Sequence, residues 1–369
     1  MKVLHLFKTY FPDSFTGVER VIWNLSEGTS PMGVDSSVLT LSSDPKAILQ
    51  VENHKVHQAN LDFYLASTGF SVSLFKKFSK ISEQADVIHY HFPWPMIDLV
   101  HLLCRPSKPT IVTYHSDIVK QRFLGKLYAP LMHLFLGSVD KIVATSPNYL
   151  ETSKVLQRWE AKTTVVPIGI DERIPPDETI LNRWRGRVGD NFFLFVGALR
   201  YYKGLSYLLE AARATGLPVV IAGKGESDFH IGDALPNVHF VGEITDSDKE
   251  ALLSLCRAFV FPSHLRSEAF GVALLEAARA GKPMISCEIG TGTSYVNKDG
   301  ETGIVVPPAS SEALADAMKT LAGEHDLVER FGVAARQRYE TLFRAEDMCA
   351  GYYDIYAQLI ADHRQKKTS

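Results

Sequence analysis

Two glutamates stand eight positions apart in SEAFGVALLEAARAGKP, residues 267 to 283. Glu276 lies in the apolar middle of this stretch, where a helix would bury most of its neighbours. A buried carboxylate is costly unless it is ion-paired or hydrogen-bonded. Glu276 therefore either pairs with Arg279 or with a basic residue elsewhere, or accepts hydrogen bonds from the hydroxyls of a polyol such as a ribose.

The start of the same stretch has the features of an anion site. If a helix begins near Ala269, the backbone N–H groups of Ala269, Phe270, Gly271 and Val272 lack acceptors within the helix. These groups carry the positive end of the helix dipole, and Gly271 has no side chain to obstruct a ligand. Glu268, just before the helix, either complements this dipole or contacts a ligand.

Two cations follow a predicted strand in FVGALRYYKGLSYLLEA, residues 195 to 211. Arg200 and Lys203 precede a helix that opens at Gly204. An arginine can form bidentate bonds to a phosphate, and a lysine adds a point charge. The pair is a candidate diphosphate clamp, although solvated cations also occur at helix starts.

The N-terminal loop TYFPDSFTGVERVIWNL, residues 9 to 25, predicts a further phosphate-sized pocket. Gly17 lies in a turn after the first strand, and a helix is expected from Val18 with Glu19 in its first turn. Neither this loop nor AGKGES, residues 222 to 227, completes a G-x-G-x-x-G fingerprint. A nicotinamide dehydrogenase is therefore disfavoured.

Histidines gather at predicted strand ends in the first half of the chain. His89 and His91 alternate along one strand face, but no carboxylate or cysteine stands at ligand spacing, so no metal site is predicted. His115, close to Asp117 after the next strand, is expected to face a ligand cleft. The alternative for His115 is a hydrogen-bonded structural role. Asp246 and Asp248 precede a helical pattern and are interpreted as N-caps rather than metal ligands.

Basic and apolar residues mix in two stretches of the first half. Residues 117 to 137 carry Lys120, Arg122 and Lys126 among large apolar side chains, and residues 73 to 80 add further lysines. A basic amphipathic helix can lie on an anionic bilayer, or it can pack on its own sheet. We expect contact of this half with a membrane surface.

The composition limits the class of protein. The 369 residues are 46% hydrophobic, which suits two domains, and the net charge of −3 excludes the basic excess of a nucleic-acid binder. The four cysteines are scattered without a C-x-x-C pair, which fits a reducing cytoplasm. No apolar run is long enough to span a membrane.

Short β-branched runs alternate with helical patterns along most of the chain, which predicts βαβ units around parallel sheets. Strands are expected within residues 2–7, 36–42, 85–91, 110–116, 140–146, 163–169, 191–197, 218–225, 237–242, 258–263, 282–288 and 302–308. From about Ser310 the chain reads as helical. We predict an N-terminal domain over 1–168 joined by a C-terminal helix over about 347–369, a linker over 169–176, and a second domain over 177–346.

These motifs resemble those of the retaining nucleotide-sugar glycosyltransferases of GT-B fold, the "glycosyl transferases group 1". The segment from Glu268 to Glu276 is similar to their E-x-F-G-x(5)-E signature, and HSD at 115, VATSPNYL at 143, PIGID at 167, AGKG at 222 and ETGIVVPP at 301 extend the match. The stretches ALRYYKG, FPSHLRSEAFG and SCEIGTGTSYVN are similar to bacterial mannosyl- and rhamnosyltransferases of O-antigen and capsule assembly. The resemblance implies two Rossmann-like domains facing across a cleft, with the C-terminal helices returning to the N-terminal, acceptor-binding domain.

The resemblance also implies a role for each motif. Glu276 would hold the ribose and Glu268 the transferred sugar, while the backbone of Phe270, Gly271 and Val272 would meet the sugar and phosphate. Arg200 and Lys203 would neutralise the diphosphate. Gly197-Ala198 replaces a usual Gly-Arg pair, so Arg200 is either a displaced substitute or does not reach the phosphate. His115 would lie by sugar and acceptor, and the Gly17 loop, with Thr16-Gly17 in place of Gly-Gly, would close over the phosphates.

The predicted activity is transfer of mannose or D-rhamnose from a GDP-sugar to a lipid-linked or glycan acceptor at the cytoplasmic membrane face, with retention and without a metal or other cofactor. No nucleophile is defined by the sequence, so same-face attack assisted by the leaving phosphate is favoured over double displacement. The alternatives are a UDP-sugar donor, a nucleotide-sugar epimerase, and a non-catalytic nucleotide-sugar sensor on the same fold. The sequence leaves the linkage and the oligomeric state open.

Overall fold

The computed structural model describes residues 1–46, 48–65, 68–118, 122–225 and 235–368. The chain forms two compact units: unit 1 comprises Met1–Gly169 and Ala345–Ser369, and unit 2 comprises Ile170–Arg344. The residues expected to link the domains, from Ile170 onward, group with unit 2. There Ile170 forms a β-bridge with Arg344, and its N–H donates to the carbonyl of Phe343 at 2.9 Å.

Unit 1 is built on a sheet with the strand order β10-β9-β8-β7-β1-β2-β4-β3. All neighbouring strands are parallel except β3 and β4. Helices join β1 to β2, β7 to β8, β8 to β9 and β9 to β10, as in βαβ units, whereas β2 and β4 are joined through β3. The strands are β1 (Lys2–Leu6), β2 (Asp35–Ser42), β3 (Leu49–Val51), β4 (His54–Asn60), β7 (Val87–Phe92), β8 (Thr110–Tyr114), β9 (Lys141–Ala144) and β10 (Thr163–Val165). A separate antiparallel pair, β5 (Phe63–Leu65) and β6 (Thr68–Phe70), follows β4.

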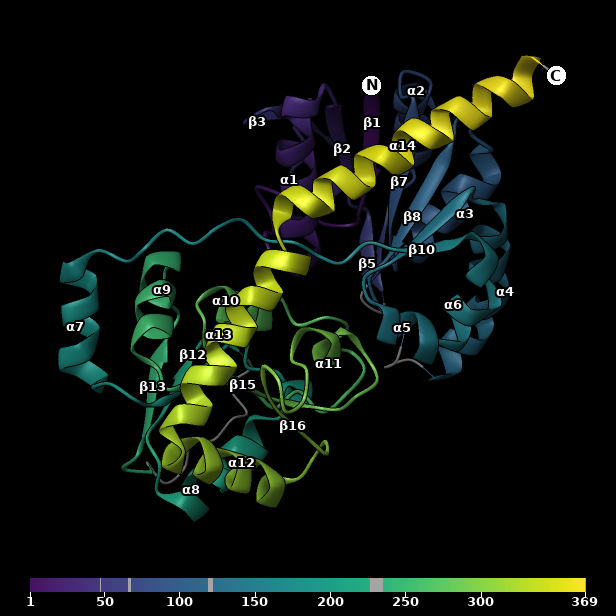
Figure 1. The fold of residues 1–369 in the computed structure, drawn as a ribbon. Coiled ribbons are helices and arrows are strands. Elements are labelled where there is room, and N and C mark those ends of the chain that lie inside the picture. The colour runs from purple at the N-terminus through teal and green to yellow at the C-terminus, as the bar shows by residue number, and fades with distance from the viewer. Residues whose placement is uncertain (47, 66–67, 119–121, 226–234, 369) are drawn as a thin grey trace. The chain divides into compact units, whose positions relative to one another are not determined.

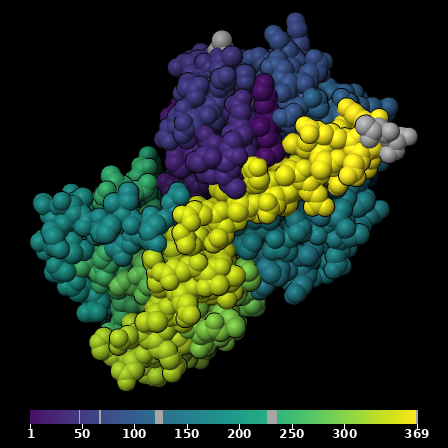
Figure 2. All heavy atoms as spheres, turned by 45° about the horizontal axis from the view of Figure 1, so that its top comes forward, coloured from purple at the N-terminus to yellow at the C-terminus, as the bar shows by residue number. Residues whose placement is uncertain are grey.

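Helices connect these strands, and the last helix of the chain returns to unit 1. They are α1 (Gly17–Thr29), α2 (Ser73–Ser82), α3 (Pro95–Cys104), α4 (Arg122–Ser138), α5 (Pro147–Thr152), α6 (Lys154–Arg158) and α14 (Ala345–Thr368), with short 3-10 turns η1 (Ser30–Met32) and η2 (Glu160–Lys162). Figures 1 and 2 show the yellow α14 running along the purple N-terminal part of the chain. Tyr352 and Tyr356 of α14 are fully buried there.

Unit 2 contains an all-parallel sheet with the order β13-β12-β11-β14-β15-β16. Its strands are β11 (Phe193–Val196), β12 (Val219–Ala222), β13 (Val238–Gly242), β14 (Ala258–Phe261), β15 (Met284–Cys287) and β16 (Gly303–Val306). Its helices are α7 (Glu178–Val188), η3 (Tyr201–Lys203), α8 (Leu205–Thr215), α9 (Asp246–Leu255), α10 (Val272–Arg279), α11 (Gly292–Val296), α12 (Ser311–Gly323) and α13 (His325–Leu342).

Strands β12, β14 and β15 of unit 2 are buried at every position, so on both faces, which explains their largely apolar sequences. Side chains of β11, β12, β14 and β15 pack with those of α8 and α12 in one hydrophobic core. Every stretch that the sequence analysis predicted as a strand contains one, and the predicted parallel α/β architecture is confirmed. No described helix is long and apolar enough to cross a membrane.

The start of α9 corrects one detail of the sequence analysis. Thr245, not Asp246 or Asp248, is the N-cap. Its hydroxyl accepts from the backbone N–H of Asp248 at 3.2 Å, while the Asp248 carboxylate accepts from the backbone N–H of Thr245 at 3.1 Å. This reciprocal capping box gives Asp248 a role at the helix start, while Asp246, the first residue of α9, forms an ion pair with Lys249.

Candidate functional site

The segment around Glu268 forms a loop between β14 and α10. The helix begins at Val272, so the predicted start near Ala269 is wrong by three residues. Gly271 takes a left-handed conformation, with φ of 87°, and a right-handed helix cannot include it. The N–H groups at the positive end of α10 are therefore those that begin at Val272. Phe270 is buried, 4% exposed, and its ring packs edge-on against the ring of Phe343.

Lys203 and Glu268, which sequence analysis assigned to different parts of a ligand, form an ion pair in unit 2. Glu268 also accepts from the Ser263 hydroxyl at 3.3 Å, and the Lys203 ammonium lies 4.7 Å from the centre of the Phe261 ring. Both side chains are largely buried, 13% and 12% exposed. An anionic ligand that binds Lys203 must therefore compete with this carboxylate.

Gly204 brings Lys203 to this position. It has a φ of 70° and caps α8, and a Cβ on it would meet the carbonyl oxygen of Pro262 at 2.0 Å. Only glycine fits this close approach of two loops. Arg200 lies at the other end of η3, and its side chain is exposed. The structure thus places both predicted cations in one loop, with one cation inside an ion pair and the other toward solvent.

Glu276 projects from α10 and pairs with Lys249 of α9, whose ammonium lies 2.6 Å from Oε1. Burial alone would lower the pKa of Lys249, but the charge of Glu276 and its hydrogen bond raise that pKa above its ordinary value. Pairing with Arg279 or with a basic residue elsewhere was one alternative expected from the sequence. Arg279 instead bonds to Glu250, and Lys249 is the basic residue elsewhere. The Lys249 ammonium thus supplies a charged hydrogen-bond partner for one oxygen of the Glu276 carboxylate in the apolar helix.

Lys249 was not singled out in the sequence analysis as the partner of Glu276. In the sequence it appears only as a charge in the first turn of a helix, and its partner stands 27 positions away. A buried acid in an apolar helix requires an ion-pair or hydrogen-bond partner, but neither spacing nor periodicity shows which residue supplies it.

His115 directly follows β8 in unit 1 and is buried, 6% exposed. Its backbone N–H donates to the carbonyl of Phe92 at 3.1 Å, and its Nε2 lies 3.0 Å from Nδ1 of His91. Asp117, its neighbour in the HSD motif, accepts hydrogen bonds from the hydroxyls of Tyr114 and Ser153 at 2.9 and 2.8 Å. The aspartate thus supports the loop in which the histidine lies.

The Gly17 loop is held by a buried carboxylate. Glu19 of α1 is 3% exposed and accepts hydrogen bonds from the hydroxyls of Thr9, Ser14 and Thr16, each at 2.8 Å. A Cβ built on Gly17 has no heavy atom within 4 Å. The folded chain therefore does not itself require a glycine at position 17.

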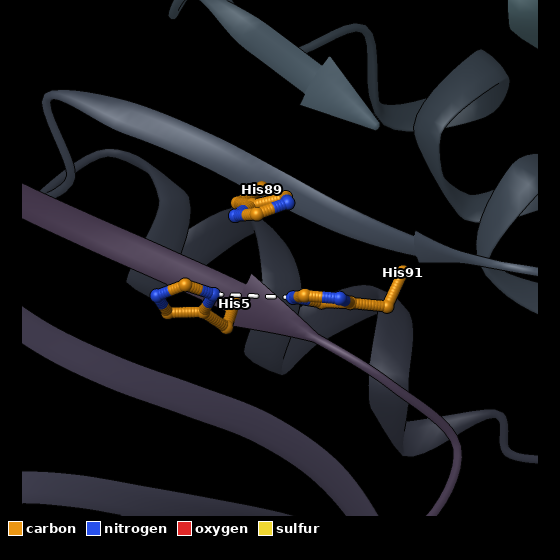
Figure 3. A group of neighbouring side chains, drawn as sticks. All are labelled: His5, His89 and His91. Carbon is orange, nitrogen blue, oxygen red and sulfur yellow. Dashed lines mark hydrogen bonds between the residues drawn. The ribbon is translucent and has the colours of Figure 1, made fainter. Parts of the chain in front are cut away.

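Three buried histidines, His5, His89 and His91, have ring nitrogens within 4.8 Å of one another, a grouping that could hold a cation (Figure 3). In the structure these nitrogens bond to protein groups. His5 Nδ1 lies 3.2 Å from His91 Nε2, and the two nitrogens of His89 each lie 2.7 Å from a hydroxyl, of Tyr356 and of Thr113. His5 was also missed in the sequence, because strand pairing brings it beside His89.

The predicted membrane surface is only partly described. Lys120 and the side chains of Arg122 and Lys126 lie outside the described residues. On α2, Lys77 donates to the carbonyl of Gln58, and it lines a cavity of about 460 Å³ together with Lys80. Membrane contact remains a prediction.

Comparison with known proteins supports an assignment for both units. The family model "Glycosyl transferases group 1" matches residues 177–338, and "Glycosyltransferase Family 4" matches residues 15–173. D-rhamnosyltransferase WbpZ of Pseudomonas aeruginosa is 53% identical over 94% of this chain and 93% of its own. O-antigen chain mannosyltransferase C of Escherichia coli is 48% identical over 98% of this chain and 99% of its own.

Solved structures share the fold at low identity. Sucrose-phosphate synthase from Thermosynechococcus elongatus superposes with a TM-score of 0.79 at 20% identity, covering 98% of this chain and 99% of its own. WaaG, described as a glycosyltransferase involved in lipopolysaccharide biosynthesis, gives 0.72 at 18% identity, covering 96% and 99%.

Proposed function

The chain belongs to the glycosyl transferases group 1 family, and on that basis we propose that it transfers mannose or D-rhamnose from a GDP-sugar in bacterial surface polysaccharide synthesis. The GT-B fold and the family that the sequence resembles are confirmed. The observation that carries the proposal is the near full-length identity of about half to a D-rhamnosyltransferase and to an O-antigen mannosyltransferase. The proposed acceptor is a lipid-linked or glycan hydroxyl.

The chemistry proposed for unit 2 is electrostatic. As the sugar–phosphate bond breaks, negative charge develops on the departing diphosphate, and preorganised cations and helix N-termini stabilise it. Lys203 and the N-terminus of α10 are the proposed groups, joined by Arg200 from the same loop. No protein metal is assigned to this step, and transfer is expected to persist in excess EDTA.

The ion pair of Lys203 with Glu268 gives this site a defined resting state. On donor binding, the Lys203 ammonium exchanges the carboxylate for the diphosphate, and Glu268 becomes an acceptor for sugar hydroxyls. The charge of Lys203 is therefore neutralised before and after binding. We assign the ribose hydroxyls to Glu276, which remains bonded to Lys249 through Oε1.

In unit 1 the proposed contact with sugar and acceptor hydroxyls is His115, and the Gly17 loop is assigned to the phosphates. We also propose retention through attack on the face that the phosphate leaves, with that phosphate accepting the acceptor proton. Proton NMR of the first product formed distinguishes retention from inversion. An inverted product contradicts this mechanism while leaving the transferase assignment intact.

A panel of GDP- and UDP-sugars in a thermal-shift experiment tests the donor, because a ligand that binds only the folded state raises the melting temperature with its concentration. GDP-mannose or GDP-D-rhamnose is expected to stabilise the protein, and stabilisation by UDP-sugars alone would overturn the GDP assignment. Conversion of the donor to another sugar without an acceptor would indicate an epimerase. Binding without transfer or hydrolysis, across lipid-linked and free glycan acceptors, would indicate a sensor.

A further inference from the structure

Buried histidines form a continuous hydrogen-bonded row in unit 1 that ends at His115. His5 Nδ1 lies 3.2 Å from His91 Nε2, and His91 Nδ1 lies 3.0 Å from His115 Nε2. Neighbouring rings in the row are stacked, with centroids 5.5 and 5.3 Å apart. The three side chains come from β1, β7 and the end of β8, which are adjacent in the sheet. Figure 3 shows the first of these bonds.

Each ring of the row is neutral at neutral pH. Burial lowers the pKa of His115 to about 3, and burial together with the nearby His54 lowers the pKa of His5 to about 3. For His91, burial and then the neighbouring His89 hold the pKa well below its ordinary value. A neutral imidazole has one N–H, so one of its nitrogens donates and the other accepts.

This chemistry couples the three rings. Each bond of the row needs one donor and one acceptor, and His91 takes part in both bonds with opposite nitrogens. If His91 is protonated on Nδ1, it donates to His115 and accepts from His5, so all three rings carry the proton on Nδ1. If it is protonated on Nε2, all three carry the proton on Nε2. Mixed patterns place two protons or none in one of the bonds.

We propose that His5 and His91 are positioning residues that set the tautomer of His115, because the three imidazoles share a single tautomer. The pattern protonated on Nδ1 makes His115 Nδ1 a hydrogen-bond donor, and the other pattern makes it an acceptor. A ligand hydroxyl that donates to His115 Nδ1 requires this nitrogen to be an acceptor. It therefore selects the pattern in which all three rings, including that of His5, are protonated on Nε2. The identity of that ligand as a sugar or acceptor rests on the proposed function, whereas the coupling itself does not.

The neighbouring His89 does not belong to the row, although its ring lies 4.2 Å from that of His91. Its two nitrogens bond to Tyr356 and Thr113, and the Thr113 hydroxyl also lies 2.7 Å from the hydroxyl of Tyr352. A metal shared by His5, His89 and His91 would have to break these bonds. The geometry favours two separate hydrogen-bonded systems in one buried cluster.

Nitrogen NMR of the full chain labelled with 15N-histidine tests the coupling without any substrate. Bare and protonated imidazole nitrogens have distinct shifts, so the tautomer of each ring can be read once His5, His91 and His115 are assigned by single substitutions. We expect one shared tautomer, all Nδ1–H or all Nε2–H. A mixed pattern, or a charged imidazolium in the row at neutral pH, would overturn the proposal.

Variants of His5 test the positioning role at a distance from the site. His5→Leu removes the partner of His91 Nε2, so we expect His115 to show both tautomers and kcat/KM for transfer to fall about tenfold, as for one lost hydrogen bond. His5→Asn places a side-chain amide near the position of His5 Nδ1. It should restore the tautomer of His115 and kcat/KM to near wild type. His101→Asn is the control, because His101 is another buried histidine that bonds Tyr90 and Ser138 outside the row.

The outcomes separate the two proposals. If His5→Leu leaves a single unchanged tautomer at His115, or if His101→Asn disturbs that tautomer equally, the positioning role is refuted. A shared tautomer in a chain that transfers no sugar supports the row and refutes the proposed function. Sugar transfer by a chain whose three rings show a mixed tautomer pattern supports the proposed function and refutes the row.

Discussion

At the scale of single residues, the structure pairs each predicted acidic site residue of unit 2 with a lysine. Glu268 binds Lys203, and Glu276 binds Lys249. A buried ion pair can be purely structural, since each partner offsets the burial of the other. The discriminating variants therefore remove one partner at a time and compare donor binding.

Glu276→Gln is expected to weaken donor binding about 10- to 100-fold, as for loss of a hydrogen bond to a charged group. Lys249→Met is the matched control, because it breaks the same ion pair without removing the carboxylate proposed to hold the ribose. Calorimetric titration with the GDP-sugar measures both. Equal weakening in the two variants would assign Glu276 a structural role only.

Lys203→Met should lower kcat by about 100- to 1000-fold, the usual cost of removing one group that stabilises developing negative charge. It also leaves the Glu268 carboxylate unpaired and should destabilise unit 2. The double variant Lys203→Met/Glu268→Gln removes the unpaired charge. We expect it to regain stability in urea unfolding but not turnover, and recovery of turnover would argue that Lys203 acts only by pairing Glu268.

At the scale of elements, two glycines at helix starts differ in whether the folded chain requires a residue without a side chain. Gly17 begins α1 with open space around its Cβ position, whereas Gly204 caps α8 at a φ of 70° with a backbone oxygen 2.0 Å from that position. In the sequence, both stretches show the same pattern, a glycine that follows a strand and opens a helix. Only the folded chain separates a glycine that the fold requires from one that it does not require.

Gly17→Ala should leave the melting temperature unchanged within a few degrees, because alanine favours helices and meets no neighbour. If the loop closes over phosphates, the same change should weaken donor binding about tenfold or more by obstructing the ligand. Gly204→Ala is expected to destabilise the protein strongly. Normal donor affinity in the Gly17 variant would exclude close phosphate contact at this position.

Elements also differ in how far the sequence predicted them. The continuously apolar strands were found, since burial on both faces leaves a clear pattern. Strand β4 was missed because its sequence HKVHQAN is mostly polar, although His54 and Gln58 are buried. Their polar groups bond to residues that are distant in the sequence, such as Glu27, whose Oε1 lies 2.5 Å from Nδ1 of His54.

At the scale of the whole molecule, buried neutral histidines link stability to pH. The folded-state pKa values of His5 and His115 are about 3, below the ordinary value of 6.5, because of burial. The unfolded chain therefore binds more protons than the folded chain between these values. Stability from these groups is complete above pH 6.5 and is lost as the pH falls toward 3.

Urea unfolding between pH 7 and 5 tests this linkage, since most carboxylates stay ionised in both states there. The free energy of unfolding should fall, with each such histidine contributing up to about 1.4 kcal/mol per pH unit below its unfolded pKa. A curve that is flat from pH 7 to 5 would contradict the neutral buried row. His5→Leu should show a shallower slope than the wild type.

The sequence by itself determined the parallel α/β architecture and the family, and it predicted where the site motifs lie, because apolar strands and short motifs are local patterns. The tertiary structure decided which residues are partners. Lys249 pairs with Glu276, and Lys203 pairs with Glu268. His5 bonds to His91, which in turn bonds to His115. These partners are brought together by strand order and loop approach. The cost of burying a charge or an N–H requires that each has a partner, but only the folded chain chooses which residue supplies it.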